Sequence, residues 1–182
     1  KWAKLLGVTP REPGPYDSRQ VNGRTWYRGK AESNPAKFAA ASYFPDKKND
    51  LASSPAEGLQ VVWLSPGSGI NDVSSLPPFL SRLVTTPSAA AGFSLVLDDF
   101  KANCQGATIT SLGGNAAYIE YANPCSAGPY LRNPADSAKS EVIVVQATQG
   151  GGFLVSQYYK KSEVMTEAET RLWQVVLAGF QG

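Results

Sequence analysis

A serine lies between two glycines in the segment LSPGSGIND, residues 64–72, which follows a strongly apolar run. Ser68 could act as a nucleophile, and Gly67, Ser68 and Gly69 together could cradle an anion at a helix start. However, the segment lacks the Gly-x-Ser-x-Gly spacing of a nucleophile elbow, and no lysine follows Gly69 as in a phosphate-binding P-loop. We interpret the segment as a tight turn, with a bare anion site at Gly67–Gly69 as the alternative.

The sequence of 182 residues contains no histidine. This absence removes the usual general base at neutral pH and every catalytic triad that needs an imidazole. It also removes the commonest transition-metal ligand, and two cysteines are too few for a zinc site within one chain. We therefore predict a protein that is not an enzyme and that binds no metal and no cofactor.

Asp98 and Asp99 are adjacent carboxylates in residues 92–100, GFSLVLDDF, whose apolar residues alternate as in a β-strand. Adjacent side chains of a strand point to opposite faces, so these two carboxylates would not share a proton. We expect a structural role for both, with a catalytic carboxylate as the alternative.

The two cysteines, Cys104 and Cys125, lack Cys-x-x-Cys spacing and lie near turn residues. The simplest interpretation is one disulfide, which closes a loop of about 20 residues and contributes about 3 kcal/mol in the chain-entropy model. A disulfide implies an oxidising compartment, so we predict a periplasmic or secreted protein. Two unpaired, buried cysteines in a cytosolic protein are the alternative.

Residues 1–35 carry seven basic and three acidic residues, whereas the rest of the chain is slightly acidic and the net charge is +2. Prolines and glycines predict an extended arm here, and aromatic residues alternate with basic ones. We expect this arm to bind a partner protein or membrane complex, with packing on its own domain as the alternative. The predicted partner-binding residues are Trp2, Tyr16, Arg24, Trp26, Tyr27 and Arg28.

The remaining chain, residues 36–182, is predicted to form one domain. Period-two patterns and turn signals predict strands, and three-to-four spacing predicts helices. The predicted strands are 36–44, 59–64, 92–100, 107–112, 116–123, 141–147 and 153–159, and the predicted helices are 73–85 and 166–180. Asn22-Gly23 and Gly113–Asn115 are expected to form hairpin turns. Because hairpins give antiparallel strands, the fold class is α+β, with helices packed on an antiparallel sheet.

The C-terminal helix is predicted to begin with the capping box Thr166–Glu169. Its buried apolar face is expected to comprise Leu172, Val175, Val176 and Phe180. The preceding segment Tyr158–Lys161 is interpreted as a sheet edge that is protected by two lysines.

The order of elements over residues 90–182 resembles the layout of the PsbP-like superfamily and related bacterial periplasmic domains. The similarity comprises the strand GGNAAYIEYAN, the hairpin EVIVVQATQGGGFLVSQYY and the closing helix EAETRLWQVVLAGF. Gly179-Phe180 stands where that family has a Ser-Phe-like pair. The resemblance implies an α/β/α sandwich and a non-enzymatic accessory, assembly or adaptor role.

We therefore expect an accessory protein outside the cytoplasm that docks to a larger, membrane-associated protein assembly through its N-terminal arm. The alternative is a secreted or periplasmic binding or inhibitor protein of the immunity type, which acts through loop 65–72 or 124–140. The charge is too small to favour nucleic acid as a partner. No apolar run in the sequence is long enough for a transmembrane helix.

Overall fold

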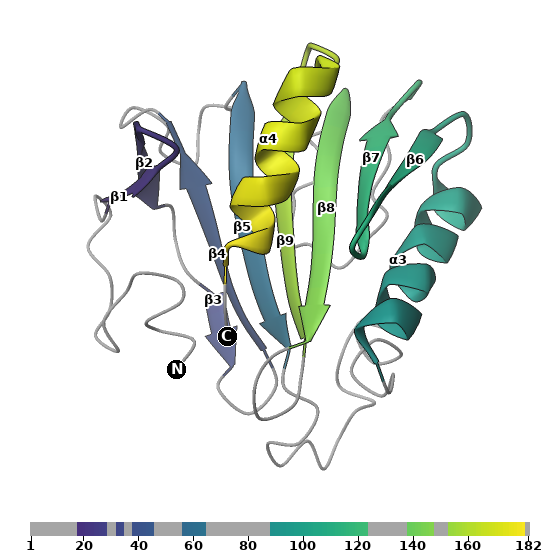
Figure 1. The fold of residues 1–182 in the computed structure, drawn as a ribbon, viewed down its shortest axis with the longest axis horizontal. Coiled ribbons are helices and arrows are strands. Elements are labelled where there is room, and N and C mark those ends of the chain that lie inside the picture. Colours follow the sequence, from purple (N-terminus) through teal and green to yellow (C-terminus); the bar gives the residue numbers. More distant parts are fainter. Residues whose placement is uncertain are drawn as a thin grey trace.

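The computed structural model describes residues 18–28, 32–34, 38–45, 56–64, 88–123, 138–147 and 153–180. These residues form one nine-stranded antiparallel sheet and two helices (Figure 1). The predicted α+β class and antiparallel sheet are confirmed. The predicted helix 73–85 lies outside the described residues.

The last strand of the chain lies in the middle of the sheet. The strand order is β1-β2-β4-β5-β9-β8-β7-β6, and β3 pairs with β4 beside β2. The strands are β1 Ser18–Val21, β2 Arg24–Arg28, β3 Glu32–Asn34, β4 Phe38–Phe44, β5 Glu57–Leu64, β6 Thr108–Gly113, β7 Ala116–Glu120, β8 Ser140–Ala147 and β9 Phe153–Lys160. Because β9 pairs with β5 along its whole length, it joins the N-terminal and C-terminal parts of the sheet.

Two hairpin turns form where the sequence predicts them. Asn22 and Gly23 both have positive φ, of 51° and 74°, as a two-residue hairpin turn of the type I′ kind requires. Gly113, Gly114 and Asn115 also have positive φ and connect β6 to β7. The strands at 59–64, 107–112 and 141–147 are confirmed to within a few residues, as is the strand within 36–44.

The sheet has an apolar cluster on each face. Alternate residues of β8 fall into different clusters, since Val142 and Val144 belong to one and Ile143 and Val145 to the other. The first, which we call the α4 face, packs against helix α4, Glu167–Ala178; the second, the α3 face, packs against helix α3, Ala89–Asn103. Two helices on opposite faces give the α/β/α layering that the resemblance implies, although one of them, α3, lies where a strand was predicted.

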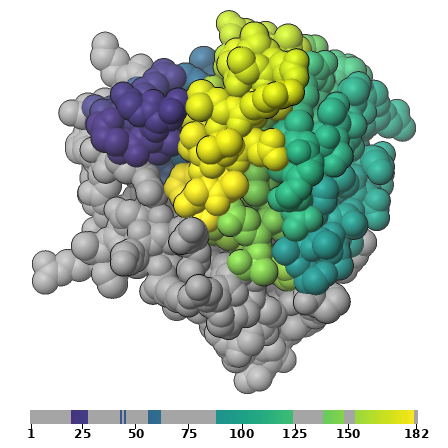
Figure 2. Space-filling model, in the orientation of Figure 1, coloured from purple at the N-terminus to yellow at the C-terminus, as the bar shows by residue number. Residues whose placement is uncertain are grey.

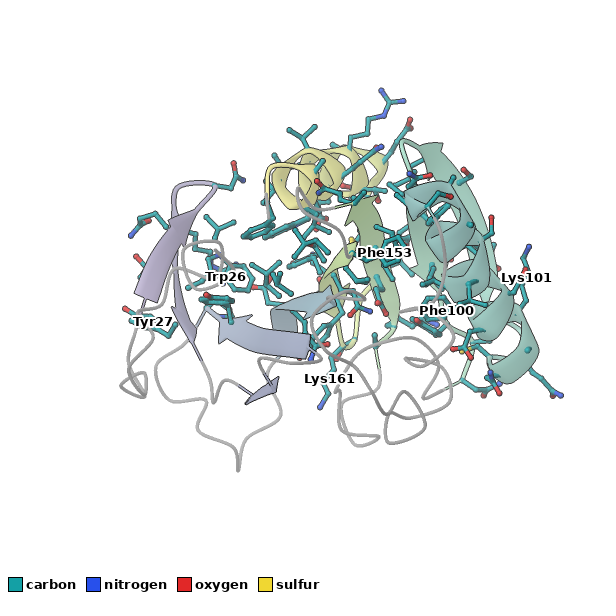
Figure 3. The ribbon with its side chains drawn as sticks, turned by 90° about the horizontal axis from the view of Figure 1, so that it is seen from below. Trp26, Tyr27, Phe100, Lys101, Phe153 and Lys161 are labelled. Carbon is teal, nitrogen blue, oxygen red and sulfur yellow. The ribbon has the colours of Figure 1, made fainter. Side chains whose placement is uncertain are left out.

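Helix α3 corrects the predicted strand at residues 92–100. Ser88 caps the helix by accepting a hydrogen bond from the Ala91 amide, and Gly92, Val96 and Phe100 form its buried stripe at a spacing of four. Apolar residues do alternate in this segment, but the same segment also has apolar residues at the spacing of a helix face. Figure 3 shows Phe100 directed into the molecule and Lys101 directed away from it.

Helix α4 begins with the predicted capping box, in which Thr166 and Glu169 exchange hydrogen bonds. Its predicted buried face is half right, because Phe180 is buried and Val176 packs against the core. The side chains that the helix itself buries are Thr170, Trp173 and Leu177. Leu172 and Val175, which we expected inside, are 41% and 72% exposed. The helix therefore has two apolar stripes, and the one with the larger side chains is buried.

The segment Tyr158–Lys161 is not a sheet edge, because β9 lies between β5 and β8. Part of the predicted N-terminal arm also belongs to the sheet, since residues 18–28 and 32–34 form β1, β2 and β3. The hairpin of β1 and β2 forms one end of the sheet as described, so residue 35 is not the boundary of the folded part.

Candidate binding cleft

Three aromatic rings from distant parts of the chain pack together on the α4 face. Trp173 of α4 stacks on Tyr158 of β9, with ring centroids 3.7 Å apart and planes 7° from parallel. Trp26 of β2 meets Trp173 edge-to-face at 5.6 Å and meets Tyr158 at 6.1 Å. Such arrangements add to the stabilisation from buried area, so this cluster fixes α4 and the β1–β2 hairpin to the sheet.

A cleft of about 560 Å³ opens beside these rings. Its lining comes from the β1–β2 hairpin, the start of β5, the end of β9, the following loop and α4. The lining residues are Val21, Asn22, Arg24, Trp26, Ala56, Glu57, Tyr158, Lys160, Ser162, Glu163, Glu169, Leu172 and Trp173. Figure 2 shows the hairpin (purple) beside α4 (yellow) on this side of the molecule.

Glu57 stands at the centre of one charged group in the cleft. Arg24 Nη1 lies 2.6 Å from Glu57 Oε1, and the Tyr158 hydroxyl donates a short hydrogen bond to Glu57 Oε2. The Arg24 guanidinium also lies over the Trp26 ring, with Cζ 5.5 Å from the centroid. Burial and the bond to Glu57 raise the pKa of Tyr158 far above its ordinary value, so the phenol stays protonated.

Lys160 and Glu169 form the second charged group. Lys160 Nζ lies 2.5 Å from Glu169 Oε2 and 3.6 Å from Glu163 Oε2. The bond to Glu169 raises the pKa of Lys160, and Lys160 in turn lowers the pKa of the Glu169 carboxyl. Both groups are therefore charged over the whole neutral range.

This arrangement favours binding over proton transfer. Glu57 is held by a cation and a phenol, and Glu169 by an ammonium, so neither carboxylate is poised as a general base. Among the described residues, no group of three or more histidine, cysteine, aspartate or glutamate side chains is placed to hold a metal ion. The cleft volume falls within the range of about 300–1,000 Å³ typical of ligand sites.

The exposed stripe of α4 continues from the cleft. Leu172 lines the cleft, and Val175 lies one turn further along the same side of the helix. Ala168 and Gly179 are also exposed and extend the stripe at both ends, with a spacing of four, three and four residues. This spacing is that of the contact seam by which one helix packs against another.

The structure brings together two of the predicted partner-binding residues. Arg24 is half exposed at the cleft, whereas Trp26 is fully buried and packs on its own domain, the alternative that we left open. Tyr27 is partly buried and points outward in Figure 3. The side chain of Arg28 is not described. Trp2 and Tyr16, the predicted anion site Gly67, Ser68 and Gly69, and the loop segments 65–72 and 124–137 lie outside the described residues.

Other residues singled out in the sequence have structural positions. Asp99 accepts two hydrogen bonds from Asn103 in the last turn of α3, and Asp98 is exposed. Cys104 is buried at the end of α3, and no free cysteine occurs in the described part of the chain. Since Cys125 lies outside that part, the Cys104–Cys125 disulfide stays a prediction.

The α3 face holds a buried carboxylate that sequence analysis missed. Glu141 of β8 is 1% exposed and accepts hydrogen bonds from the Tyr121 hydroxyl at 2.8 Å and from Gln157 Nε2 at 2.5 Å. A glutamate in the apolar run EVIVV was a usable signal, because a charged residue in a central strand needs internal partners. Of the cleft residues, the sequence singled out Arg24 and Trp26 as partner-binding residues, but it did not join them to the rest of the lining, which comes from three other segments.

Comparisons with protein-family models, with curated proteins and with solved structures found no match. The resemblance to the PsbP-like superfamily therefore stays a prediction. In the described residues, no helix combines the length and apolarity needed to cross a membrane.

Proposed function

We propose that this protein is a non-enzymatic accessory protein that docks to a partner protein through the cleft and the adjoining outer stripe of α4. One observation carries the proposal: a cleft whose charges are already paired continues into exposed Leu172 and Val175. Large apolar side chains left in water beside a concave surface are typical of interaction sites.

The composition of this surface supports a protein as the partner. Interface centres are enriched in aromatic residues and arginine, and their rims are polar. Here Trp173 and Trp26 are among the residues that line the cleft, and the exposed Glu167–Arg171 ion pair flanks the α4 stripe. The surface thus differs from the predicted site, since it uses the hairpin end of the arm together with a helix from the other end of the chain.

The compartment and the assembly are part of the same proposal. A Cys104–Cys125 disulfide would require an oxidising environment, and the burial of Cys104 is compatible with it. We place the protein outside the cytoplasm, in the periplasm or secreted, where it would join a larger membrane-associated assembly.

The test is site-specific photocrosslinking in native extract. A photoreactive amino acid at Val175 should give one discrete crosslinked partner, identified by mass spectrometry, and the same residue at Lys101 of α3 should not. Leu172→Glu and Val175→Glu, each with an unchanged thermal midpoint, should abolish capture of that partner by the purified protein. Crosslinking from Lys101 alone, or capture that survives both substitutions, would remove the proposal.

A further inference from the structure

The structure assigns a ligand chemistry to the cleft: it binds an arginine side chain of the partner, whose guanidinium replaces that of Arg24 between Glu57 and the Trp26 ring. This inference rests on the proposed function and names the chemical group that the surface selects. The resident Arg24 shows that a guanidinium fits the position, since it pairs with Glu57 and covers Trp26 at the same time.

Glu57 is a prepared acceptor for such a group. Its side chain is 17% exposed, and the Tyr158 hydroxyl occupies Oε2, which leaves Oε1 directed at Arg24. Tyr158 is held in turn by its stack on Trp173, so the carboxylate does not depend on Arg24 for its orientation. A guanidinium arriving from outside would therefore meet an acceptor that is already oriented.

The exchange of one arginine for another costs little. The Arg24 side chain is 54% exposed and follows a two-residue turn, and an ion pair with one well-exposed partner contributes little to stability. When Arg24 moves into water, an incoming guanidinium recovers both the ion pair and the contact with the Trp26 ring. Burial by the partner then strengthens both interactions, because the surrounding dielectric constant falls.

Charge in the cleft favours a cation over an anion. The lining includes the carboxylates Glu57, Glu163 and Glu169 but only two cations, Arg24 and Lys160. Lys160 stays with Glu169 at 2.5 Å, so the departure of Arg24 leaves Glu57 as the unsatisfied group. Arginine suits this place better than lysine, because its planar group can stack on an indole ring while it hydrogen-bonds a carboxylate.

The experiment measures binding of N-acetyl-arginine amide to the purified chain by tryptophan indole NMR shifts at constant ionic strength. Arg24→Ala empties the position, and the variant's dissociation constant for the probe should be up to about fivefold lower than that of the wild type, the gain expected when a weak competing ion pair is removed. Arg24→Ala/Glu57→Gln should lose this gain, and the neutral analogue N-acetyl-citrulline amide should bind none of the variants. Lys101→Ala, which removes an exposed cation of α3 on the opposite face of the sheet, should match the wild type. Arg24→Gln serves as the second vacant variant if Arg24→Ala does not fold.

Equal dissociation constants for the wild type and the vacant variants would overturn the inference, as would binding that survives the loss of the Glu57 charge. Equal affinity for the citrulline analogue would also overturn it, because that probe lacks the positive charge. These outcomes are separate from the crosslinking test. A partner captured through Leu172 and Val175 with no arginine binding would reject the ligand chemistry and leave the docking surface intact.

Discussion

On the α4 face the charged side chains stand around the cleft, whereas on the α3 face a carboxylate lies inside the packed side chains. Glu57 and Glu169 pair with Arg24 and Lys160 at the cleft wall, above an aromatic floor. Glu141, by contrast, is 1% exposed and accepts hydrogen bonds from Tyr121 and Gln157. Both faces belong to the same central strands, so the difference arises from alternate residues of β8 and β9.

The difference separates a surface that is suited to contact from a buried carboxylate that is held by internal hydrogen bonds. Exposed ion pairs exchange partners at little cost, and large apolar side chains remain accessible on α4. A buried carboxylate that loses its donors has no water to replace them. Substitutions on the two faces should therefore differ in how strongly they affect folding.

The largest effect is expected from Trp173→Ala on the α4 face. It removes a ring that is 7% exposed and stacks on Tyr158, and we expect a loss of about 4 kcal/mol in unfolding free energy. Urea denaturation measures this loss. The control is Leu172→Ala, the exposed neighbour, which should cost less than about 1 kcal/mol. Similar losses for the two variants would show that the buried stripe of α4 is not the one described.

Glu141→Ala on the α3 face should cost somewhat less, about 3 kcal/mol, because it leaves two buried donors, Tyr121 and Gln157, without this acceptor. Glu141→Gln keeps the volume and one acceptor oxygen, so its loss should be smaller. Denaturation curves of both variants at neutral pH give the comparison. A Glu141→Ala variant as stable as the wild type would contradict a buried, hydrogen-bonded role.

What the sequence reveals about this fold depends on how local the signal is. The turns at Asn22-Gly23 and Gly113–Asn115 were predictable because their residues tolerate positive φ. The capping box at Thr166 was predictable because its partners lie three residues apart. Helix α3 was missed because Phe93, Leu95 and Leu97 alternate, although Ser88 followed by three alanines is a helix start signal.

The cleft could not be predicted from the sequence, because its parts come together only in the folded chain. Trp26 and Tyr158 are far apart in the chain, and nothing local places β9 at the centre of the sheet. For the same reason, Tyr158–Lys161 resembled a protected edge. The buried face of α4 was ambiguous because both stripes are apolar, and the rings of Trp26 and Tyr158, from distant strands, select Trp173 over Leu172 and Val175.

A third substitution tests how tightly the side chains are packed on the α3 face of the sheet. Gly58 of β5 lies opposite Tyr159 of β9, and a Cβ atom at Gly58 would come within 2.5 Å of the tyrosine ring. Gly58→Ala should therefore cost about 2 kcal/mol through overpacking. In a Tyr159→Ala background the same change should cost little, and a double-mutant cycle measures the coupling. An equal cost in both backgrounds would place the effect in the backbone and not in the ring.

The smallest effect is expected at the ion pair of the α4 face. Glu169→Gln removes the charge that pairs with Lys160 but retains an acceptor for the Thr166 cap, since glutamine also serves in a capping box. At neutral pH the loss should stay below about 1 kcal/mol, because the pair is partly exposed.

The sign of its pH dependence follows from the lowered pKa of the Glu169 carboxyl. A carboxyl group with a lower pKa in the folded state stabilises the fold above its unfolded pKa, of about 4.3, and loses this contribution as the pH falls further. The wild type should therefore lose more unfolding free energy between pH 5 and pH 3 than Glu169→Gln does. Urea denaturation of both proteins at the two pH values measures this change in unfolding free energy. Equal losses for the two proteins would contradict a stabilising role of the Lys160–Glu169 pair in folding. The pair would then be available for contacts with a partner at no cost to the fold.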